Sequence, residues 1–177
     1  MTWLYAVFAG SDWVPIAVAG ATACFVAMCG ALLTDIGPWY RQLRKPSWQP
    51  PDWAFGPAWT LIFTLTAWAG VLAWNRAPDD AMRICVASAF ALNSLLNILW
   101  SLLFFTWRRP DWALMEVVAL WLSIVALIVL LATLAPLGAW LLTAYLAWVS
   151  FAAFLNWTVV RLNRPFPMRF AVGGSAS

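Results

Sequence analysis

The sequence contains no histidine among its 177 residues. Without imidazole groups, the chain offers no histidine ligand for haem iron, no histidine general base and none of the usual zinc sites. Charged residues are also scarce, at 10% of the chain, and no glycine-rich phosphate loop, nucleophile elbow or pair of carboxylates appears. We therefore expect no metal site, and any chemistry must use less usual residue types.

Cysteine is rare as well. The three cysteines, Cys24, Cys29 and Cys85, fall within apolar segments or at the end of one. Their spacing fits no metal site, and a disulfide framework would need pairing outside the lipid. We interpret all three as small apolar packing residues.

Apolar sequence is abundant: 64% of the residues are hydrophobic and the mean hydropathy is +0.82. This composition predicts an integral membrane protein. A helix of about 20 residues spans the roughly 30 Å hydrocarbon core, and the apolar runs lack the alternation of barrel strands. The sequence therefore predicts an all-α membrane protein, a five-helix transmembrane bundle in a single domain of residues 1–163. The expected spans are residues 13–33, 53–74, 84–107, 112–134 and 137–160.

The basic residues are unevenly distributed between the two sides of such a bundle. Only Arg76 and Arg83 fall on one side, whereas eight of the ten basic residues fall in the first loop, the third loop and the tail. The positive-inside rule then places the first loop and the C-terminus in the cytoplasm and the N-terminus outside. Residues 164–177 are rich in Pro, Gly and Ser and are expected to form a mobile cytoplasmic tail. The net charge of +3 reflects this asymmetry and does not indicate a nucleic-acid partner.

The first loop, residues 39–60, is rich in tryptophan and contains four prolines and three basic residues. Pro46, Pro50 and Pro51 prevent one continuous helix, because proline lacks a backbone donor and restricts the residue before it. Indole and phenol rings favour the membrane interface, where an apolar ring and a polar group are both accommodated. The loop is therefore predicted to form a stiff, amphipathic cap at the bilayer surface.

One face of the third span is polar and aromatic. Asn93, Asn97, Trp100, Ser101 and Phe104 recur at steps that return to the same side of a helix. Amide side chains inside a bilayer are costly unless they are hydrogen-bonded, so this face is expected to point inward. Two interpretations stay open: the amides tie helices together, or they form the polar base of a ligand cavity.

Several tryptophans lie away from the predicted span ends, where indoles serve as ordinary interfacial anchors. If they converge on inward faces, they suit a flat polycyclic ligand, because rings stack on rings and a few polar groups set orientation. A lipid-facing position is the alternative for each of them. They are Trp59, Trp68, Trp100, Trp121, Trp148 and Trp157.

Two further features have structural interpretations. A stripe of alanines at four-residue spacing in the first span predicts close helix packing, within one bundle or between chains; it comprises Ala19, Ala23, Ala27 and Ala31. Glu116 lies near the start of the fourth span, where Arg108 or Arg109 is expected to pair with it.

Longer motifs carry a resemblance to a known family. The segment Trp39–Trp53 reads W-Y-x-x-L-x-K-P-x-W-x-P-P-x-W and is followed by G-P-A-W at residues 56–59. Residues 92–97 read L-N-x-x-x-N, Glu116 precedes Trp121 by five positions, and residues 144–148 read A-Y-L-A-W. In these elements the chain resembles the tryptophan-rich sensory proteins and translocator proteins, also called peripheral-type benzodiazepine receptors.

The resemblance implies a five-helix bundle, often a homodimer, whose pocket opens toward the first loop and binds porphyrins, sterol-like molecules and other flat aromatic ligands. The cholesterol motif of the family is incomplete, because no Lys or Arg follows Tyr145 within five residues. By motif, the ligand-binding residues would be Tyr40, Pro50, Trp59, Phe63, Asn93, Asn97, Trp100, Trp121, Trp148 and Ala152.

Three hypotheses follow. In the first, the chain binds a tetrapyrrole, with protoporphyrin IX as ligand and no obligatory cofactor, and senses, sequesters or moves it. In the second, the resemblance implies light- and oxygen-dependent degradation of that porphyrin, with Trp59 and Trp148 as catalytic residues. In the third, the chain is a structural or regulatory partner of another membrane complex and acts through its alanine stripes.

Overall fold

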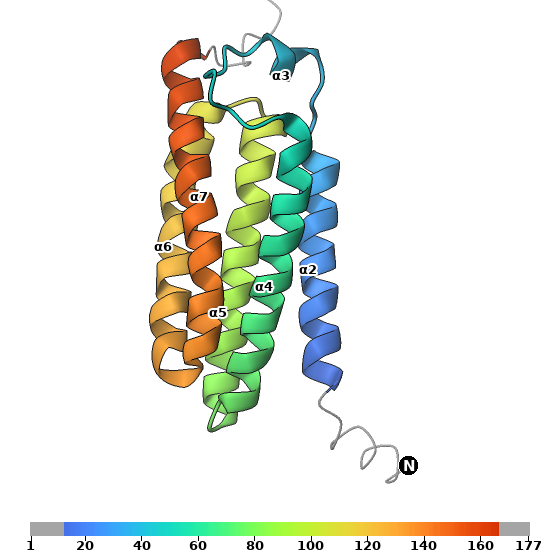
Figure 1. Cartoon of the computed structure of the whole chain (residues 1–177), viewed down its shortest axis with the longest axis vertical. Coiled ribbons are helices and arrows are strands. Elements are labelled where there is room, and N and C mark those ends of the chain that lie inside the picture. Colours follow the sequence, from blue (N-terminus) through green and yellow to red (C-terminus); the bar gives the residue numbers. More distant parts are fainter. Residues whose placement is uncertain (1–12, 167–177) are drawn as a thin grey trace, which may run out of the picture.

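A computed structural model of the chain describes residues 13–166, and the remaining N-terminal residues and most of the predicted tail lie outside this range. Five apolar helices run side by side along the long axis of the molecule (Figure 1). No strand occurs in residues 13–166, so the all-α five-helix prediction is confirmed. The helices are α2 (Trp13–Leu33), α4 (Phe55–Arg76), α5 (Asp80–Ser101), α6 (Pro110–Leu134) and α7 (Pro136–Asn163).

Local sequence signals set where several helices begin. The Asp79 carboxylate accepts a hydrogen bond of 2.7 Å from Met82 N and so caps α5, which starts at Asp80 instead of residue 84. α6 and α7 each start at a proline, whose missing N–H has no partner in the first turn of a helix anyway. These capping residues lie in the short connections between spans. The length of an apolar run alone therefore does not locate the end of a helix.

The tight part of the bundle lies where α4, α6 and α7 meet. Gly138 of α7 approaches its neighbours so closely that a Cβ atom there would lie 2.9 Å from Leu131 Cδ2 and 3.3 Å from Ala69 O. Small residues permit this approach, and van der Waals contact then holds the helices together. The fully buried residues of this region are Ala69, Ala73, Ile124, Leu127, Leu131 and Leu142.

Helix α2 packs much more openly. Val26 is its one buried residue, although the helix lies beside α4 and α5. The alanine stripe turns toward the bundle, but it lines two cavities as well as contacting neighbouring helices: Ala19 and Ala23 border one cavity, and Ala27 and Ala31 border the other. The stripe therefore leaves space inside the bundle.

Residues 34–54 connect α2 to α4 and run over one end of the bundle (Figure 1). They contain the short helix α3 (Pro38–Gln42) and a single 3-10 turn (Asp52–Ala54), so the prolines interrupt the helix as predicted. Asn163 at the end of α7 fixes the connection: its Oδ1 accepts from Arg44 N and its Nδ2 donates to Arg44 O, both at 2.8 Å. Trp48 stacks on Phe154 of α7 at 5.2 Å between ring centroids.

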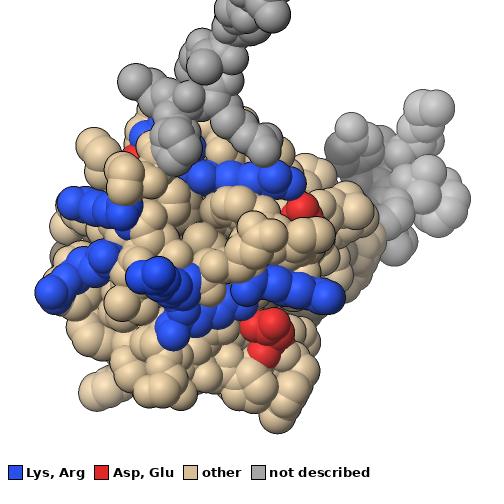
Figure 2. Space-filling view, turned by 90° about the horizontal axis from the view of Figure 1, so that it is seen from above, with Lys and Arg blue, Asp and Glu red and all other residues tan. Residues whose placement is uncertain are grey.

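The same end of the molecule carries most of the basic side chains. Figure 2, which views it from above, shows Lys and Arg spread across this surface with few acidic groups. Arg109 pairs with Asp111 (Nε to Oδ1, 2.8 Å), and Arg108 lies 3.7 Å from Asp35. The predicted ion pair of Glu116 with Arg108 or Arg109 is therefore wrong: both of its carboxylate oxygens are buried and have no hydrogen-bond partner among residues 13–166. Asp111 takes Arg109 because it is only two residues away and accepts from both nitrogens.

Candidate ligand-binding site

A cavity of about 610 Å³ lies beneath the connection of residues 34–54. It is bordered by the C-terminal part of α2, the N-terminal half of α4, the C-terminal end of α5 and the C-terminal half of α7. The connection itself contributes eight residues, which are Thr34, Ile36, Tyr40, Leu43, Lys45, Gln49, Asp52 and Trp53. The cavity thus has helix walls in the membrane-spanning region and a polar rim at the end of the bundle.

Aromatic rings form much of its wall. Trp59 and Trp148 meet edge to face, with ring centroids 6.3 Å apart and an interplanar angle of 83°. Trp59 stacks on Phe63 at 5.2 Å, and Trp100 stacks on Phe104 at 5.2 Å. These ring pairs stiffen the walls, because each indole is held in place by another aromatic group.

A π-helical segment (Leu102–Thr106) continues α5 and shapes one side of the cavity. The wider turn brings Phe104 and Phe105 together, with ring centroids 4.8 Å apart, and both line the cavity. Single π turns are frequent at functional sites. Phe105 was missed by sequence reasoning, because a regular α-helical step places it on a different face from Phe104.

Two indole donors in this wall have no partner. The Nε1 atoms of Trp100 and Trp148 are buried and make no hydrogen bond in residues 13–166. An indole N–H can only donate, and a buried donor without a partner destabilises the protein. Both indoles line the cavity, but their Nε1 atoms are covered by protein, so a bound molecule would reach either donor only after a neighbouring group moves.

The rim is a compact polar cluster. Gln49 Nε2 donates to Tyr40 OH and to Asp52 Oδ1, and Tyr40 OH donates to Asp52 Oδ1, each at 3.3 Å. Lys45 Nζ lies 3.4 Å from the centre of the Tyr40 ring. Burial and the nearby Asp52 charge raise the pKa of Tyr40 to about 12, whereas burial lowers the pKa of Lys45. The Lys45 ammonium is poorly hydrated, so an anion beside it would be stabilising.

Two asparagines of α5 lie at or near the inner end of the cavity. Asn97 Nδ2 donates to Tyr145 OH at 3.0 Å and is buried between α5 and α7. Asn93 Nδ2 donates to Ser123 Oγ of α6 at 2.8 Å. Both asparagines therefore tie helices together, and Asn97 lines the cavity at the same time. Of the two interpretations left open by the sequence, the tie between helices is seen for both asparagines, and a ligand-binding role for Asn97 stays a prediction.

The structure brings most of the predicted ligand-binding residues together. Pro50, Asn93 and Trp121 do not line this cavity. The indole of Trp121 lies against α7 on the outside of the bundle, where its Nε1 donates to Ser150 Oγ at 2.9 Å. The predicted residues that do line the cavity are Tyr40, Trp59, Phe63, Asn97, Trp100, Trp148 and Ala152.

The predicted convergence of six inner tryptophans holds for half of them. Trp59, Trp100 and Trp148 line the cavity. The other three lie on the outer surface: Trp68 is 54% exposed, Trp157 is 41% exposed and Trp121 is 36% exposed. Spacing along one helix does not distinguish an inward face from a lipid-facing one when both faces are apolar.

The five apolar helices and the enclosed aromatic cavity define a class: a multi-pass integral membrane protein with an internal site of small-molecule size. Comparison with known proteins narrows this class. The chain belongs to the TspO/MBR family, whose model matches residues 14–162.

Individual relatives agree. The chain is 40% identical to tryptophan-rich protein TspO of Chlorobaculum tepidum over 71% of this chain and 79% of that protein. It is 33% identical to the translocator protein of Homo sapiens over 85% of this chain and 91% of that protein. It is also 33% identical to the tryptophan-rich sensory protein of Cereibacter sphaeroides, over 78% and 89% of the two chains.

Proposed function

We propose that this membrane protein binds a tetrapyrrole, protoporphyrin IX, and senses, sequesters or moves it. The observation that carries the proposal is the cavity of about 610 Å³, within the usual range for small-molecule sites, which four indoles line. They are those of Trp53, Trp59, Trp100 and Trp148. A flat, aromatic ligand matches the size of the cavity and its ring-rich walls.

The rim supports an orientation for such a ligand. A porphyrin would be held by burial of its macrocycle against Trp59, Trp148 and Trp100, because apolar area removed from water or lipid headgroups dominates binding. Its carboxylates would lie at the rim beside Lys45, whose ammonium is poorly hydrated, with the Tyr40 hydroxyl close by. The backbone of Arg44 is held by Asn163 and its side chain is exposed, so Lys45 is the better placed of the two basic residues.

Two further parts of the proposal concern the setting of the site. The basic surface in Figure 2 supports a cytoplasmic position for the connection and the end of α7, and hence an external start of α2. The open packing of α2 leaves helix surface that supports a homodimer.

Fluorescence titration tests the binding proposal. Protoporphyrin IX added to the detergent-solubilised protein should quench tryptophan emission saturably at micromolar concentration. Trp148→Phe should weaken the affinity, because it removes an indole from the wall. Trp121→Phe is the matched control outside the cavity and should titrate like the wild type. Quenching that never saturates, or equal affinities for both variants, would remove the proposal.

The edge-to-face contact of Trp59 with Trp148 favours a second function. In this alternative the photoexcited porphyrin is degraded with dioxygen as oxidant, and these two indoles relay the oxidation from the macrocycle. Illumination of the aerobic complex should yield a new absorbing product, and Trp148→Phe should slow its formation. If variant and wild type bleach at the same rate under saturating porphyrin, the indoles act only as walls.

A further inference from the structure

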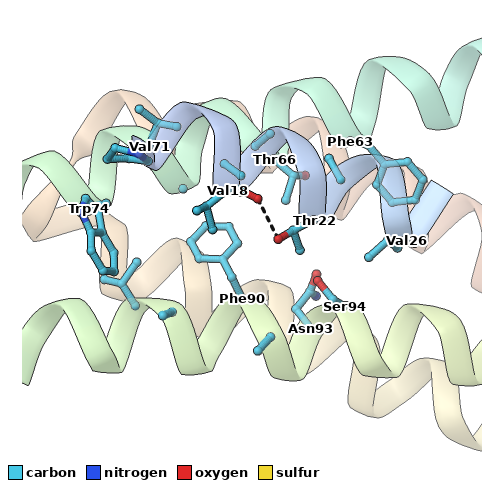
Figure 3. Close-up of a pocket in the computed structure, with 18 of the residues that line it drawn as sticks. Val18, Thr22, Val26, Phe63, Thr66, Val71, Trp74, Phe90, Asn93 and Ser94 are labelled. Atoms are coloured by element: carbon cyan, nitrogen blue, oxygen red, sulfur yellow. Dashed lines mark hydrogen bonds between the residues drawn. The ribbon is translucent and has the colours of Figure 1, made fainter. Parts of the chain in front are cut away.

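A second and larger cavity, of about 870 Å³, lies in the other half of the bundle between α2, α4 and α5. Figure 3 shows Thr22 of α2 facing Asn93 and Ser94 of α5 across this space. The cavity reaches from Arg83 near the start of α5 to Asn97, and at 1.5 Å per residue this separation is roughly 21 Å. It is thus longer than the hydrocarbon depth of one leaflet, which is about 15 Å.

The surface of this cavity is largely apolar, and most of its polar groups are already bonded within the protein. Thr22 Oγ1 donates to Val18 O at 2.8 Å, as the dashed line in Figure 3 marks. Asn93 and Asn97 donate to Ser123 and to Tyr145, respectively. Thr66 Oγ1, by contrast, is buried and has no partner within residues 13–166. An aliphatic chain therefore fits the length of the cavity better than a polar molecule does.

One cationic group stands at the outer end. Arg83 Nη1 lies 3.1 Å from Asp80 Oδ1, and its guanidinium lies 5.7 Å from the Trp74 ring centre. The Arg83 side chain is 42% exposed. Its guanidinium has several N–H donors and therefore keeps donors open to an anion, at the depth where the head groups of a membrane lipid lie.

The bilayer has access to the cavity because α2 covers it incompletely. Val26 is the buried residue of α2, while Val14 and Val18, which line the cavity, are exposed on the same helix. Ala87 and Ala91 of α5 also line the cavity and are exposed. Lipid surrounds this surface at very high concentration, so mass action favours a chain drawn from the membrane itself.

We propose that this cavity binds one acyl chain of an acidic phospholipid, with the phosphate of the lipid at Arg83 and the chain lying along α2, α4 and α5. The second chain stays in the bilayer. The two cavities share Phe63 and Asn97 as a wall, but the lipid site uses a different rim and a different helix face. It does not depend on porphyrin binding in the first cavity.

Photo-crosslinking tests the proposal on the full chain in phosphatidylcholine nanodiscs. The probe is phosphatidylglycerol with a diazirine at the end of one acyl chain, and labelled residues are mapped by mass spectrometry. We expect label on the cavity faces of α2, α4 and α5. Label confined to the outward faces of α6 and α7 in the wild-type protein would overturn the proposal without any variant.

Paired variants then separate the cavity from the general lipid surface. Ala23→Phe places a ring inside the cavity and should reduce labelling of α5 severalfold, whereas Ala21→Phe adds the same ring on the exposed side of α2 and should not. Thermal unfolding of each variant establishes that it is folded, and Ala67→Phe on α4 repeats the test if α2 tolerates no ring. Equal labelling in the cavity-filled and control variants would refute the site.

A last comparison tests the head group and the source of the chain. Arg83→Gln should lower labelling by phosphatidylglycerol about threefold, as loss of a partly exposed charge contact implies, while Arg76→Gln, exposed at the same end, should leave it unchanged. A diazirine phosphatidylcholine probe carries the same phosphate beside a compensating choline cation, so Arg83→Gln should lower its labelling less than that of phosphatidylglycerol. If a diazirine fatty acid labels the cavity and the phospholipid probe does not, the occupant is a free acid and the phospholipid proposal is wrong.

Discussion

Replacing Asn163 by alanine is expected to loosen the connection of residues 34–54 while leaving the bundle folded. The Asn163 side chain makes two hydrogen bonds to the Arg44 backbone and one to Val159 O, all at 2.8 Å. The two bonds to Arg44 hold the connection against α7. They are exposed to solvent, so each contributes toward the lower end of the range of about 0.5–1.5 kcal/mol for a typical hydrogen bond.

Losing about 1–2 kcal/mol of the free energy that holds residues 34–54 against α7 makes the fraction of molecules with this segment detached roughly 5- to 30-fold larger. Hydrogen exchange of the Arg44 amide should accelerate by that factor, since exchange reports local opening directly. The porphyrin affinity should fall much less, because a binding-competent state that stays mostly populated changes the apparent affinity little. Thermal unfolding of the bundle should shift only slightly.

Asn163→Asp is the matched control. A carboxylate keeps the acceptor for Arg44 N but loses the donor to Arg44 O, so exchange at Arg44 should lie between that of the wild type and that of the alanine variant. If the Arg44 amide exchanges at the same rate in all three proteins, Asn163 does not hold the connection. Faster exchange throughout α6 would instead mean that the substitution unfolds the bundle.

Three further outcomes follow from the same geometry. Tyr145→Phe should destabilise the protein by about 1–3 kcal/mol in thermal unfolding, because it leaves the buried Asn97 amide without its partner. Gly138→Val should cost about 1–3 kcal/mol or more in the same assay, since even a Cβ meets Leu131 at 2.9 Å; an unchanged unfolding temperature would contradict the tight contact. Because the pKa of Tyr40 is raised to about 12, its contribution to stability should be complete below pH 10 and lost as the pH rises through 12; Tyr40→Phe should abolish that alkaline component.

The helices could be predicted well because a membrane span has few physical solutions. Long apolar runs must satisfy their backbone groups internally, and only helices do so without pairing partners. Trp13–Leu33 was predicted with the bounds that the structure shows. The start of α5 was not, because the Asp79 cap lies in a polar connection outside the apolar run.

The cavity residues could be predicted where a motif or an amide marked them, as at Trp59, Asn97 and Trp148. Hydrophobicity alone did not indicate which face of a helix points into the bundle, because in a bilayer the inward and outward faces are both apolar. Trp68, for which the sequence left an inward and a lipid-facing position open, is exposed, and so is Trp121, which the family motif had placed in the site. Phe105 escaped detection because the π turn shifts the helical register, and no residue in Leu102–Thr106 signals such a turn.

Uneven packing explains how one small bundle holds two cavities. Close contacts such as that of Gly138 with Leu131 and Ala69 concentrate the stability in α4, α6 and α7. α2 makes fewer such close contacts, and its small residues border open space. Ala23 faces the larger cavity and Ala27 faces the smaller one. Moving α2 by a small amount would change the volume of both cavities together while the rigid core stays intact. A ligand in one cavity is therefore expected to change the affinity of the other cavity through α2. The affinity rises if both ligands favour the same position of α2 and falls if they favour different positions.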